Sequence, residues 1–536
     1  MIHLLLSALS ALIQRLVKTN KPRGQATARG LALCAALAFG CGRPASPPAR
    51  YLQVDIENSP TATDPRFATD AISSRVMELI FDSMVKVDRK GQLVGDLAES
   101  IERPDQSRII FHLKSGIRFS NGRELTSRDV KFTYDSILDR WSASPKRAGL
   151  EQLKSLAIPD DHTVVITTAR PYAPALEMGT YGIVPAGTPL PPAGGAVSPP
   201  GTGAFKMTKY VRDESAWLER NPYRPAPANS PQGIVFKIVP DPTVRALELA
   251  EGVCDVAPNN VDPEVLSYLL SNPDLRLNEA PGSGYVYLLF NFRNPQLHDL
   301  RVRRAIAYAI DRTAIVGAFL RGTARIATGM LVPENWAYDA NVRSYDYDPQ
   351  LARRLLDAAG YHADQHGLRD LKFTYKTTPE NVRIAEVLQA MLRRVGIRIE
   401  IRSNEWATFY SDLGNGNFDL ASMRWIGIND PNHYFLTFDS QMVPPRGLNR
   451  GAYSNPEMDA LLEAGMSTLE TAARRTIYGR VQRLAADDLP YVSLWWLQNV
   501  TVLNREVTGF EPYPNGSLRS LTSVTLVAPF ASEARE

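Results

Sequence analysis

The chain has 536 residues, too many for one hydrophobic core, so two or three folding units are expected. Its content of 44% hydrophobic and 22% charged residues is typical of a globular protein and excludes a largely disordered chain. The 60 basic and 57 acidic residues nearly cancel, and no basic stripe contains interleaved aromatic residues, so nucleic acid is not an expected partner.

The N-terminal segment has the layout of a secretory signal. Basic residues within 18–29 precede an apolar run, 31–39, that is too short to span a bilayer, and a small residue then precedes Cys41. We predict a lipoprotein-like signal peptide over 1–41, with Cys41 as the lipidated residue, and a flexible tether over 42–50. Ordinary signal-peptide cleavage and an uncleaved anchor are the alternatives. No later run is apolar enough for a membrane span, so a lipid anchor would be the only attachment to a membrane.

The first elements after the tether alternate between strand and helix. Residues 51–56 alternate between the two faces of a strand, and Val76, Ile80 and Met84 have helical spacing, which predicts a helix over 73–85. Further along, Asn-Gly at 121–122 predicts a hairpin turn, and Thr126 predicts a helix start. The nearly continuous apolar run 285–292 predicts a central buried strand, and 491–497 predicts a late strand.

Residues 371–425 predict a wound α/β unit. Strands are expected at 371–375, 397–401 and 418–425, with a helix over 381–395 between the first two and another helix before the third. Crossovers of this kind are right-handed and make the strands parallel. Ligands bind beyond the carboxyl ends of the strands in such sheets.

Trp425 stands at one of these strand ends. The stretch reads as a helix from Glu405, a tight turn at 414–417 and the strand 418–425, so that Trp406 and Trp425 flank the turn. We therefore predict a binding site at Trp425; the alternative is that its side chain is part of the core.

Residue patterns that carry catalysis or bind metal are weak in this chain. His362 and His366 have the i, i+4 spacing of metal ligands, but they flank a loop, so no metal site is expected. No Gly-x-Ser-x-Gly elbow is present, and the pair Asp160-Asp161 is typical of a solvated turn. We predict a protein that is not an enzyme and has no cofactor.

Several ordered motifs together resemble the family-5 extracytoplasmic solute-binding proteins, the oligopeptide, dipeptide and nickel receptors of ATP-binding-cassette importers. The motifs are 79–85 (LIFDSMV), 96–100 (DLAES), 111–119 (FHLKSGIRF), Asn121-Gly122, Asp129-Val130, 201–205 (GTGAF), 218–222 (LERNP), Phe290-Asn291, 301–312 (RVRRAIAYAIDR), Glu405-Trp406 and 453–459 (YSNPEMD). They span nearly the whole chain after residue 51.

The resemblance implies an α/β, two-lobed periplasmic-binding-protein fold, class II-like, with a third, inserted subdomain. Lobe I would comprise 51–282, including the subdomain at about 83–185, and the returning segment 496–536. Lobe II would comprise 283–495. The strands near 285–292 and 491–497 would connect the lobes, which would close on the ligand about a hinge.

The implied function is that of a monomeric receptor in the periplasm or cell envelope. It would capture a peptide-like solute and deliver it to the permease of an ATP-binding-cassette importer. Alternatives are the same binding role for a metal chelate, haem or a sugar-like solute, a hydrolase that uses carboxylates in a cleft, and a sensor or adhesin with no transporter.

The resemblance also implies which residues contact the ligand. The positions that match ligand-contacting positions of the family are Thr69, Asp70, Tyr181, Trp406, Trp425 and Trp496. For each of them, the alternative is a packed aromatic residue or a solvated polar residue.

The chain departs from the peptide-binding pattern next to Trp425. Peptide-binding relatives often have an aspartate three residues after this tryptophan, where it pairs with the ammonium of the peptide. Here that position is Ile428, and Asp430 follows two residues later. Either Asp430 replaces the usual acid or no ammonium is recognised, and both interpretations stay open.

Overall fold

The computed structural model describes residues 50–191, 198–259 and 261–527. The predicted signal peptide over 1–41, Cys41 and residues 42–49 of the tether lie outside the described residues. No helix in the described ranges combines the length and the apolarity needed to cross a bilayer.

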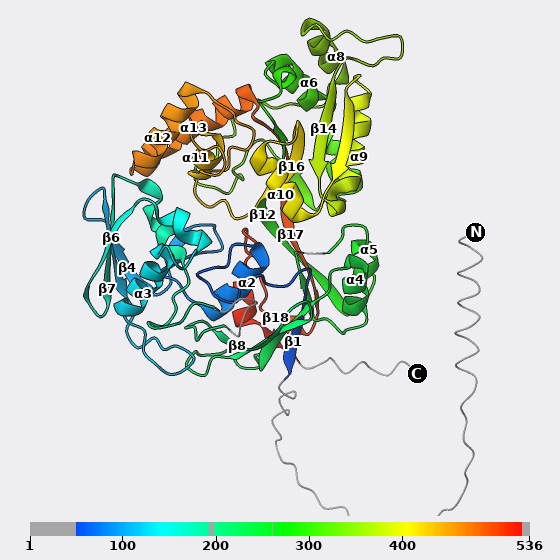
Figure 1. Cartoon of the computed structure of the whole chain (residues 1–536). Helices are drawn as coiled ribbons and strands as arrows, with labels where there is room; N and C mark the ends of the chain where they lie inside the picture. The colour runs from blue at the N-terminus through cyan, green and yellow to red at the C-terminus, as the bar shows by residue number, and fades with distance from the viewer. Residues whose placement is uncertain (1–49, 192–197, 260, 528–536) are drawn as a thin grey trace, which may run out of the picture. The chain divides into compact units, whose positions relative to one another are not determined.

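A mixed sheet of 11 strands forms the frame of the described residues (Figure 1). In spatial order its strands are β15 (Arg398–Ser403), β14 (Lys372–Thr377), β16 (Leu420–Trp425), β12 (Leu275–Phe290), β17 (Tyr491–Asn504), β11 (Val256–Pro258), β1 (Tyr51–Ile56), β10 (Gly233–Ile238), β9 (Ser215–Arg220) and β8 (Phe205–Val211), with β13 (Ala324–Ile326) beside β17. Below, lobe I means residues 51–282 with 496–527 and lobe II means 283–495, following the predicted division.

Lobe II has helices on both faces of its part of the sheet (Figure 1). One face carries α6 (Leu300–Ala309), α8 (Pro349–Ala358) and α9 (Val382–Arg393), and the other carries α10 (Trp406–Asn415), α11 (His433–Phe438), α12 (Pro456–Ser467) and α13 (Thr471–Asp488). In β12, Leu288 and Phe290 pack under the first set of helices, and Tyr287 and Leu289 pack under the second set. The strand is thus buried on both faces, as the run 285–292 predicts, although it begins earlier, at Leu275.

The predicted wound unit over 371–425 is confirmed. β14 pairs in parallel with both β15 and β16, and α9 and α10 connect these strands. Gly416 ends α10 with φ of 76°, a left-handed conformation that glycine adopts without strain. The predicted turn between the helix and the strand depends on this residue.

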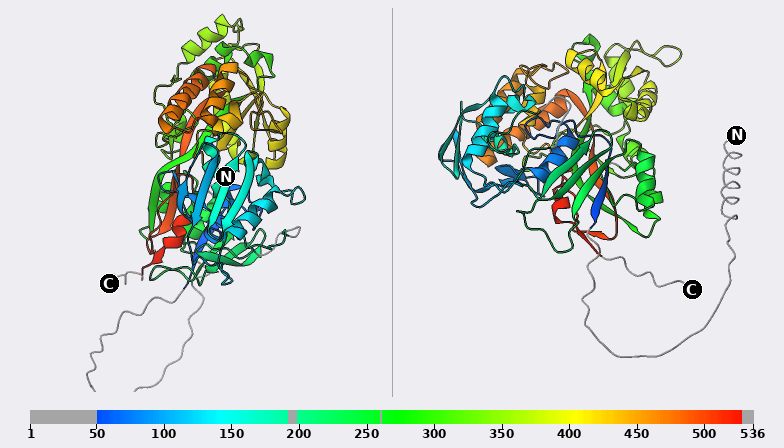
Figure 2. Two further views of the ribbon diagram at one scale, coloured as in Figure 1. Left: turned by 90° about the vertical axis from the view of Figure 1, so that its left-hand side faces the viewer. Right: turned by 60° about the horizontal axis from the view of Figure 1, so that its bottom comes forward.

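The two long strands β12 and β17 connect the lobes. They pair antiparallel from Leu275–Asn504 to Leu289–Tyr491, and the register shifts between Ala280 and Gly284. In the left view of Figure 2 they run beside each other from one lobe into the other. At the shift, a Cβ on Gly282 would lie 2.3 Å from the carbonyl oxygen of Leu497, so the two backbones approach too closely for a side chain.

A separate small sheet lies in the range of the predicted inserted subdomain. Its strands, in order, are β4 (Ala98–Glu102), β5 (Arg108–Leu113), β7 (Thr163–Thr168) and β6 (Leu153–Asp160), all antiparallel. The helix α3 (Ser127–Leu138) packs against it, and their shared core includes Met84, Phe111, Tyr134 and Ile183. Thr126 precedes α3 as predicted, and its backbone N–H donates to Asp129.

The prediction of one helix over 73–85 is wrong at its C-terminal end. The helix α2 spans Ala71–Ile80, and Phe81 has an extended backbone, with φ of −119° and ψ of 125°. Met84 belongs to the core of the inserted subdomain, whereas Val76 and Ile80 belong to the core of lobe I. The apolar spacing continued because both segments are buried, although only the first is helical.

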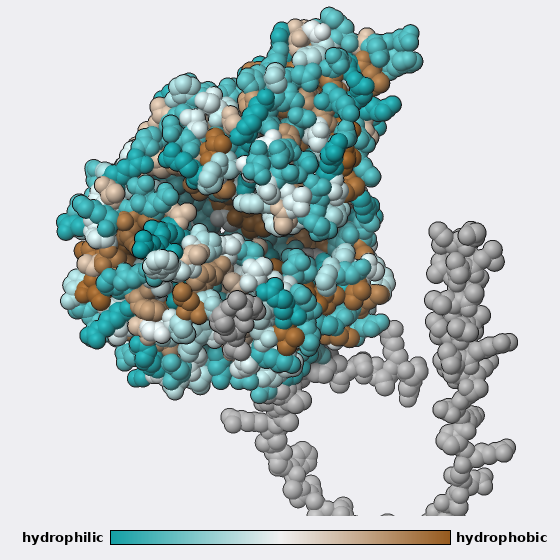
Figure 3. Space-filling model, in the orientation of Figure 1, coloured by the Kyte–Doolittle hydropathy of each residue, from teal (hydrophilic) through white to brown (hydrophobic). Residues whose placement is uncertain are grey.

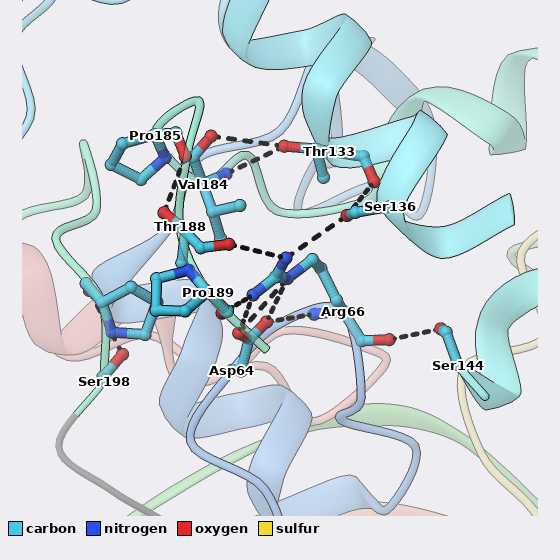
Figure 4. A network of polar contacts seen from close by, with 11 residues as sticks. Asp64, Arg66, Thr133, Ser136, Ser144, Val184, Pro185, Thr188, Pro189 and Ser198 are labelled. Carbon is cyan, nitrogen blue, oxygen red and sulfur yellow. Dashed lines mark hydrogen bonds and ion pairs between the residues drawn. The ribbon is translucent and has the colours of Figure 1, made fainter. Parts of the chain in front are cut away.

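A buried ion pair lies in the loop after β1, and hydrogen bonds of the same loop reach the inserted subdomain and the segment that follows it (Figure 4). The side chain of Arg66 is 1% exposed and pairs with Asp64 at 2.7 Å. Its guanidinium also donates to the carbonyl of Pro189, and Ser144 donates to the carbonyl of Arg66, both at 2.7 Å. These bonds satisfy a buried cation, which would otherwise be costly to bury.

Both ends of the described chain belong to lobe I. Leu52 of β1 and Leu526 of β19 (Thr525–Leu526) pack in one core, and β19 pairs with β18 (Val507–Thr508).

Candidate functional site

A cavity of about 1020 Å³ is lined by residues of both lobes. Lobe I contributes α2, the loop before it and residues near Asn515, and lobe II contributes α9, α10 and β16. Figure 3 shows a hollow on the face that carries α2 and α10, with hydrophobic residues visible inside. A large pocket with apolar walls and a few polar groups is the usual form of a site for a small ligand.

The wall from lobe I is the polar face of α2. Ala71, Ser74, Arg75 and Glu78 follow the i, i+3, i+4, i+7 spacing and line the cavity. Glu78 accepts hydrogen bonds from the Ser517 hydroxyl and the Leu518 amide, both at 2.7 Å. Burial raises the pKa of Glu78, and the nearby Arg519 opposes this rise.

The wall from lobe II combines aromatic rings with two cations, one of which, Arg383, is paired with Glu264. Trp406 and Phe409 of α10 and Trp495 of β17 contribute rings, and Arg424 of β16 contributes a guanidinium. Desolvation by the surrounding walls and the charge of Arg75 lower the pKa of Arg424 from its usual value, although its side chain is accessible within the cavity.

Three of the predicted site residues line the cavity: Thr69, Asp70 and Trp406. Trp406 is 58% exposed and contacts the rings of Phe409 and Tyr410. Asp70 is the N-cap of α2, and its carboxylate accepts the Ser73 amide at 2.7 Å. Asp70 therefore fixes the start of α2, the helix that forms one wall of the cavity.

Trp425 and Trp496 do not line the cavity. Successive side chains of a strand point to opposite faces, and Arg424 and Trp495 line the cavity while Trp425 and Trp496 do not. Trp425 stacks on Tyr287, with 5.9 Å between ring centroids. Trp496 is 3% exposed, and its indole donates to the Gly329 carbonyl at 3.0 Å.

Tyr181 and Asp430 also lie away from the cavity wall. Tyr181 packs edge-on against Tyr134 in the inserted subdomain. The two carboxylate oxygens of Asp430 accept hydrogen bonds from Arg474 at 2.6 and 2.7 Å. Ile428 is buried in the core of lobe II. Ammonium recognition by Asp430 stays a prediction, and it would compete with this ion pair.

Arg75 and Arg424 line the cavity and were not predicted as site residues from the sequence. Both had a signal: Arg75 lies on the polar face of an otherwise apolar helix, and Arg424 is the single charge in the strand 418–425 after Asp419. Strand alternation from Trp425 would have placed Arg424 on the other face, but it could not say which face lines a cavity.

Lobe II also contacts lobe I and its inserted subdomain through ion pairs, one of which, Glu264 with Arg383, lies at the cavity wall. Glu264 of lobe I pairs with Arg383 of lobe II at 2.5 Å, and Arg170 of the subdomain pairs with Glu463 of lobe II. Glu177 of the subdomain lies near Asp430 and Arg474 of lobe II, and burial, followed by the charge of Asp430, raises its pKa to about 8.

Metal-ligating side chains do not gather at this site. In the described parts of the chain, no group of three or more His, Cys, Asp or Glu residues is arranged to hold a metal ion.

Comparison with known proteins identifies the family. The family described as bacterial extracellular solute-binding proteins, family 5 Middle, matches residues 92–442, which is well over half of the chain. The chain belongs to this family. A curated family-5 relative, the probable di/tripeptide-binding protein 5 of Pseudomonas aeruginosa, is 28% identical over 503 residues, covering 87% of this chain and 94% of the relative.

Solved family-5 structures share the fold. The oligopeptide-binding protein AppA from Bacillus subtilis, in complex with a nonapeptide, has a TM-score of 0.77 and 24% identity, covering 90% of this chain and 100% of that one. NikA from Brucella suis, in complex with Fe(III)-EDTA, has a TM-score of 0.81 and 23% identity, covering 89% and 100%. The predicted periplasmic-binding-protein fold is thereby confirmed.

The family assignment also confirms the predicted class of protein. Family-5 proteins are extracytoplasmic solute-binding receptors, so this chain is a binding protein and not an enzyme.

Proposed function

We propose that this family-5 protein captures a peptide-like solute between its two lobes and delivers it to the permease of an ATP-binding-cassette importer. The observation that carries the proposal is the cavity of about 1020 Å³, which residues of both lobes line. Closure of the lobes would bury a ligand in it, and a ligand favours closure only by the difference between its affinities for the closed and open forms.

The proposed lobe boundaries are those given above: lobe I over 51–282 with 496–536, lobe II over 283–495 and the inserted subdomain at about 83–185. The register shift between Ala280 and Gly284 supports the first boundary, because an interrupted ladder is a place where two strands can bend.

The proposed site consists of Thr69, Asp70 and Trp406 together with Arg75, Arg424 and Trp495, all of which line the cavity. Trp425, Trp496, Tyr181 and Asp430 would support the site from outside this lining, each through the contacts described above.

Gentle purification followed by mass spectrometry of the released ligand tests the proposal. The expected result is a set of peptide masses in stoichiometric amount. Peptides that are bound but converted to products would instead favour a hydrolase.

A second candidate keeps the receptor role and changes the ligand to a metal chelate. The fold similarity to NikA with bound Fe(III)-EDTA favours it, as does Ile428 at the position where the resemblance implies an acid. A single recurring non-peptide mass in the same experiment would select it over the peptide.

We also propose that the mature protein is a monomer held at the cell envelope by a lipid on Cys41. The layout of residues 1–41 supports this proposal. A Cys41→Ser variant is expected to move from the membrane fraction to the soluble fraction. Unchanged fractionation would contradict lipidation.

A further inference from the structure

Two arginines from different lobes line the cavity without protein partners. Among the described residues, the guanidinium group of neither Arg75 of α2 nor Arg424 of β16 donates a hydrogen bond or forms an ion pair within 4 Å. Arg424 has an exposed side chain although it lies inside the cavity, and Arg75 is half-buried beside Gly516. Both guanidinium groups are therefore available to a ligand.

Three other charged groups of the cavity already have partners. Glu78 is held by Ser517 and Leu518, and Glu264 by Arg383. Arg245 donates to the carbonyls of Val239 and Pro240 at 2.7 and 2.8 Å. The two free arginines thus differ from Glu78, Glu264 and Arg245.

The electrostatics between the two arginines favour an anion. Arg75 and Arg424 repel each other, and Glu57, which lies near both, and Glu78, which lies near Arg75, offset part of this repulsion. A guanidinium presents a planar fork of donors that matches a carboxylate, and such charge-assisted bonds are stronger than neutral ones. A single carboxylate in contact with both arginines would replace repulsion across the lobes by attraction.

We infer that Arg75 and Arg424 form an anion clamp, in which one carboxylate of the ligand bridges the two lobes and favours their closure. This inference rests on the proposed function, because it names the chemistry of the solute that the same cavity takes. The ligand class is a carboxylate-bearing solute, and the clamp itself does not need a free ammonium group, because both of its charged groups are cations.

The rest of the cavity fits the apolar part of such a solute. Trp406, Phe409 and Met423 from lobe II and Trp495 and Leu497 from β17 form an aromatic and aliphatic wall near the clamp. The clamp would therefore orient a ligand that has one anionic end and an apolar body.

Four probes test the clamp by isothermal titration calorimetry at pH 7 and low salt: trialanine, N-acetyl-trialanine, trialanine amide and Fe(III)-EDTA. N-acetyl-trialanine is expected to bind at least as tightly as trialanine. Trialanine amide, which lacks the carboxylate, is expected to bind about 10- to 100-fold more weakly, the range that a charge-assisted hydrogen bond contributes.

Variants assign the effect to the two arginines. Arg75→Gln and Arg424→Gln are each expected to remove the preference for the carboxylate over the amide. Arg424→Lys keeps the positive charge and is expected to retain part of the preference for the carboxylate. Arg354→Gln, an exposed arginine on α8, is the matched control and is expected to bind like the wild type. Circular dichroism of each variant checks its fold.

The outcomes separate the clamp from the proposed function. Peptides that bind with equal affinity as acid and amide, or variants that keep the preference, overturn the clamp while the receptor function stands. If Fe(III)-EDTA is the one probe that binds, and the Arg75→Gln/Arg424→Gln double variant does not bind it, the clamp is supported. The same result contradicts a peptide as the ligand. The clamp is overturned if the wild type binds none of the carboxylate probes more tightly than the double variant does.

Discussion

Trp406 and Trp496 have the same side chain in opposite surroundings. Trp406 begins α10 and is 58% exposed at the cavity, whereas Trp496 is 3% exposed and donates a hydrogen bond to Gly329. An exposed ring can bury its apolar area only against a ligand, and a buried ring has already done so in the core. The two residues should therefore respond differently to removal.

Trp406→Ala is expected to weaken binding of the best wild-type ligand about tenfold or more, because a large aromatic contact is lost. Its melting temperature should stay close to the wild-type value. Trp496→Ala is expected to lower the free energy of unfolding by about 3–5 kcal/mol, as for other buried aromatic residues. Calorimetric titration and thermal unfolding measure the two effects. Equal loss of stability in both variants would contradict the role of Trp406.

Glu177 predicts a pH dependence of stability. Burial and Asp430 raise its pKa from 4.5 to about 8, and Arg474 opposes this rise; Tyr172 also lies near it. Between pH 4.5 and 8 the unfolded chain loses this proton while the folded chain keeps it. The stabilisation is therefore complete below pH 4.5 and is lost as the pH rises through 8.

Glu177→Gln cannot titrate, so between pH 5 and pH 8 this variant should lose less stability than the wild type does. Urea unfolding at both pH values measures the difference. Glu99→Gln, an exposed position on β4 of the same subdomain, is the control and should behave like the wild type. A Glu177→Gln variant with the wild-type pH dependence would refute the assignment.

For Arg424 and Trp425, the sequence predicts that the two side chains point to opposite faces of the strand but not which face lines the cavity. The strand that carries both residues was predicted from local alternation, which also implies that they point to opposite faces. Which face lines the cavity depends on α2, more than 300 residues earlier in the chain, and no local pattern contains that information. For this reason Trp425, and not Arg424, was predicted to contact the ligand.

At the scale of elements, the register shift of β12 is the feature most sensitive to substitution. A Cβ on Gly282 would meet the Leu497 carbonyl oxygen at 2.3 Å, whereas a Cβ on Gly284 would have its nearest atom at 3.6 Å, an ordinary contact. The two glycines are two residues apart on the same strand and differ in the space around them.

Gly282→Ala is expected to lower the free energy of unfolding by about 1–3 kcal/mol, because the backbones of β12 and β17 must separate. Gly284→Ala is the matched control and should change it much less. Urea unfolding compares the two. Equal stability of both variants would mean that the strands adjust without cost.

Elements whose formation depends on nearby residues were predicted well, and elements that depend on distant parts of the chain were predicted less well. The unit β14–α9–β15–α10–β16 has short connections, clear periodicity and glycine at the ends of its helices, and its order was predicted correctly. The full lengths of β12 and β17 depend on their pairing with each other across some 200 residues. The end of α2 depends on where the chain enters the inserted subdomain.

At the scale of the whole described structure, two exposed ion pairs join lobe II to lobe I and its subdomain. They are Glu264 with Arg383 and Arg170 with Glu463. Exposed pairs contribute at most about 1 kcal/mol to stability, but they can shift an equilibrium between open and closed forms that differ little in free energy.

The double variant Glu264→Gln/Glu463→Gln is therefore expected to keep its melting temperature while its ligand-free form has a larger radius of gyration in small-angle scattering. Glu400→Gln, which removes an ion pair to Lys372 within lobe II, is the control. A radius that stays the same as in the control would show that these pairs do not hold the lobes together.

The packing of β1 and β19 in one core has a practical consequence. A fluorophore or surface attachment introduced near residue 51 or residue 526 would sit on lobe I in both cases. Immobilisation through either end would leave lobe II free to swing. A dye placed on lobe II would then report solute capture optically. The protein is therefore suited to use as an optical biosensor.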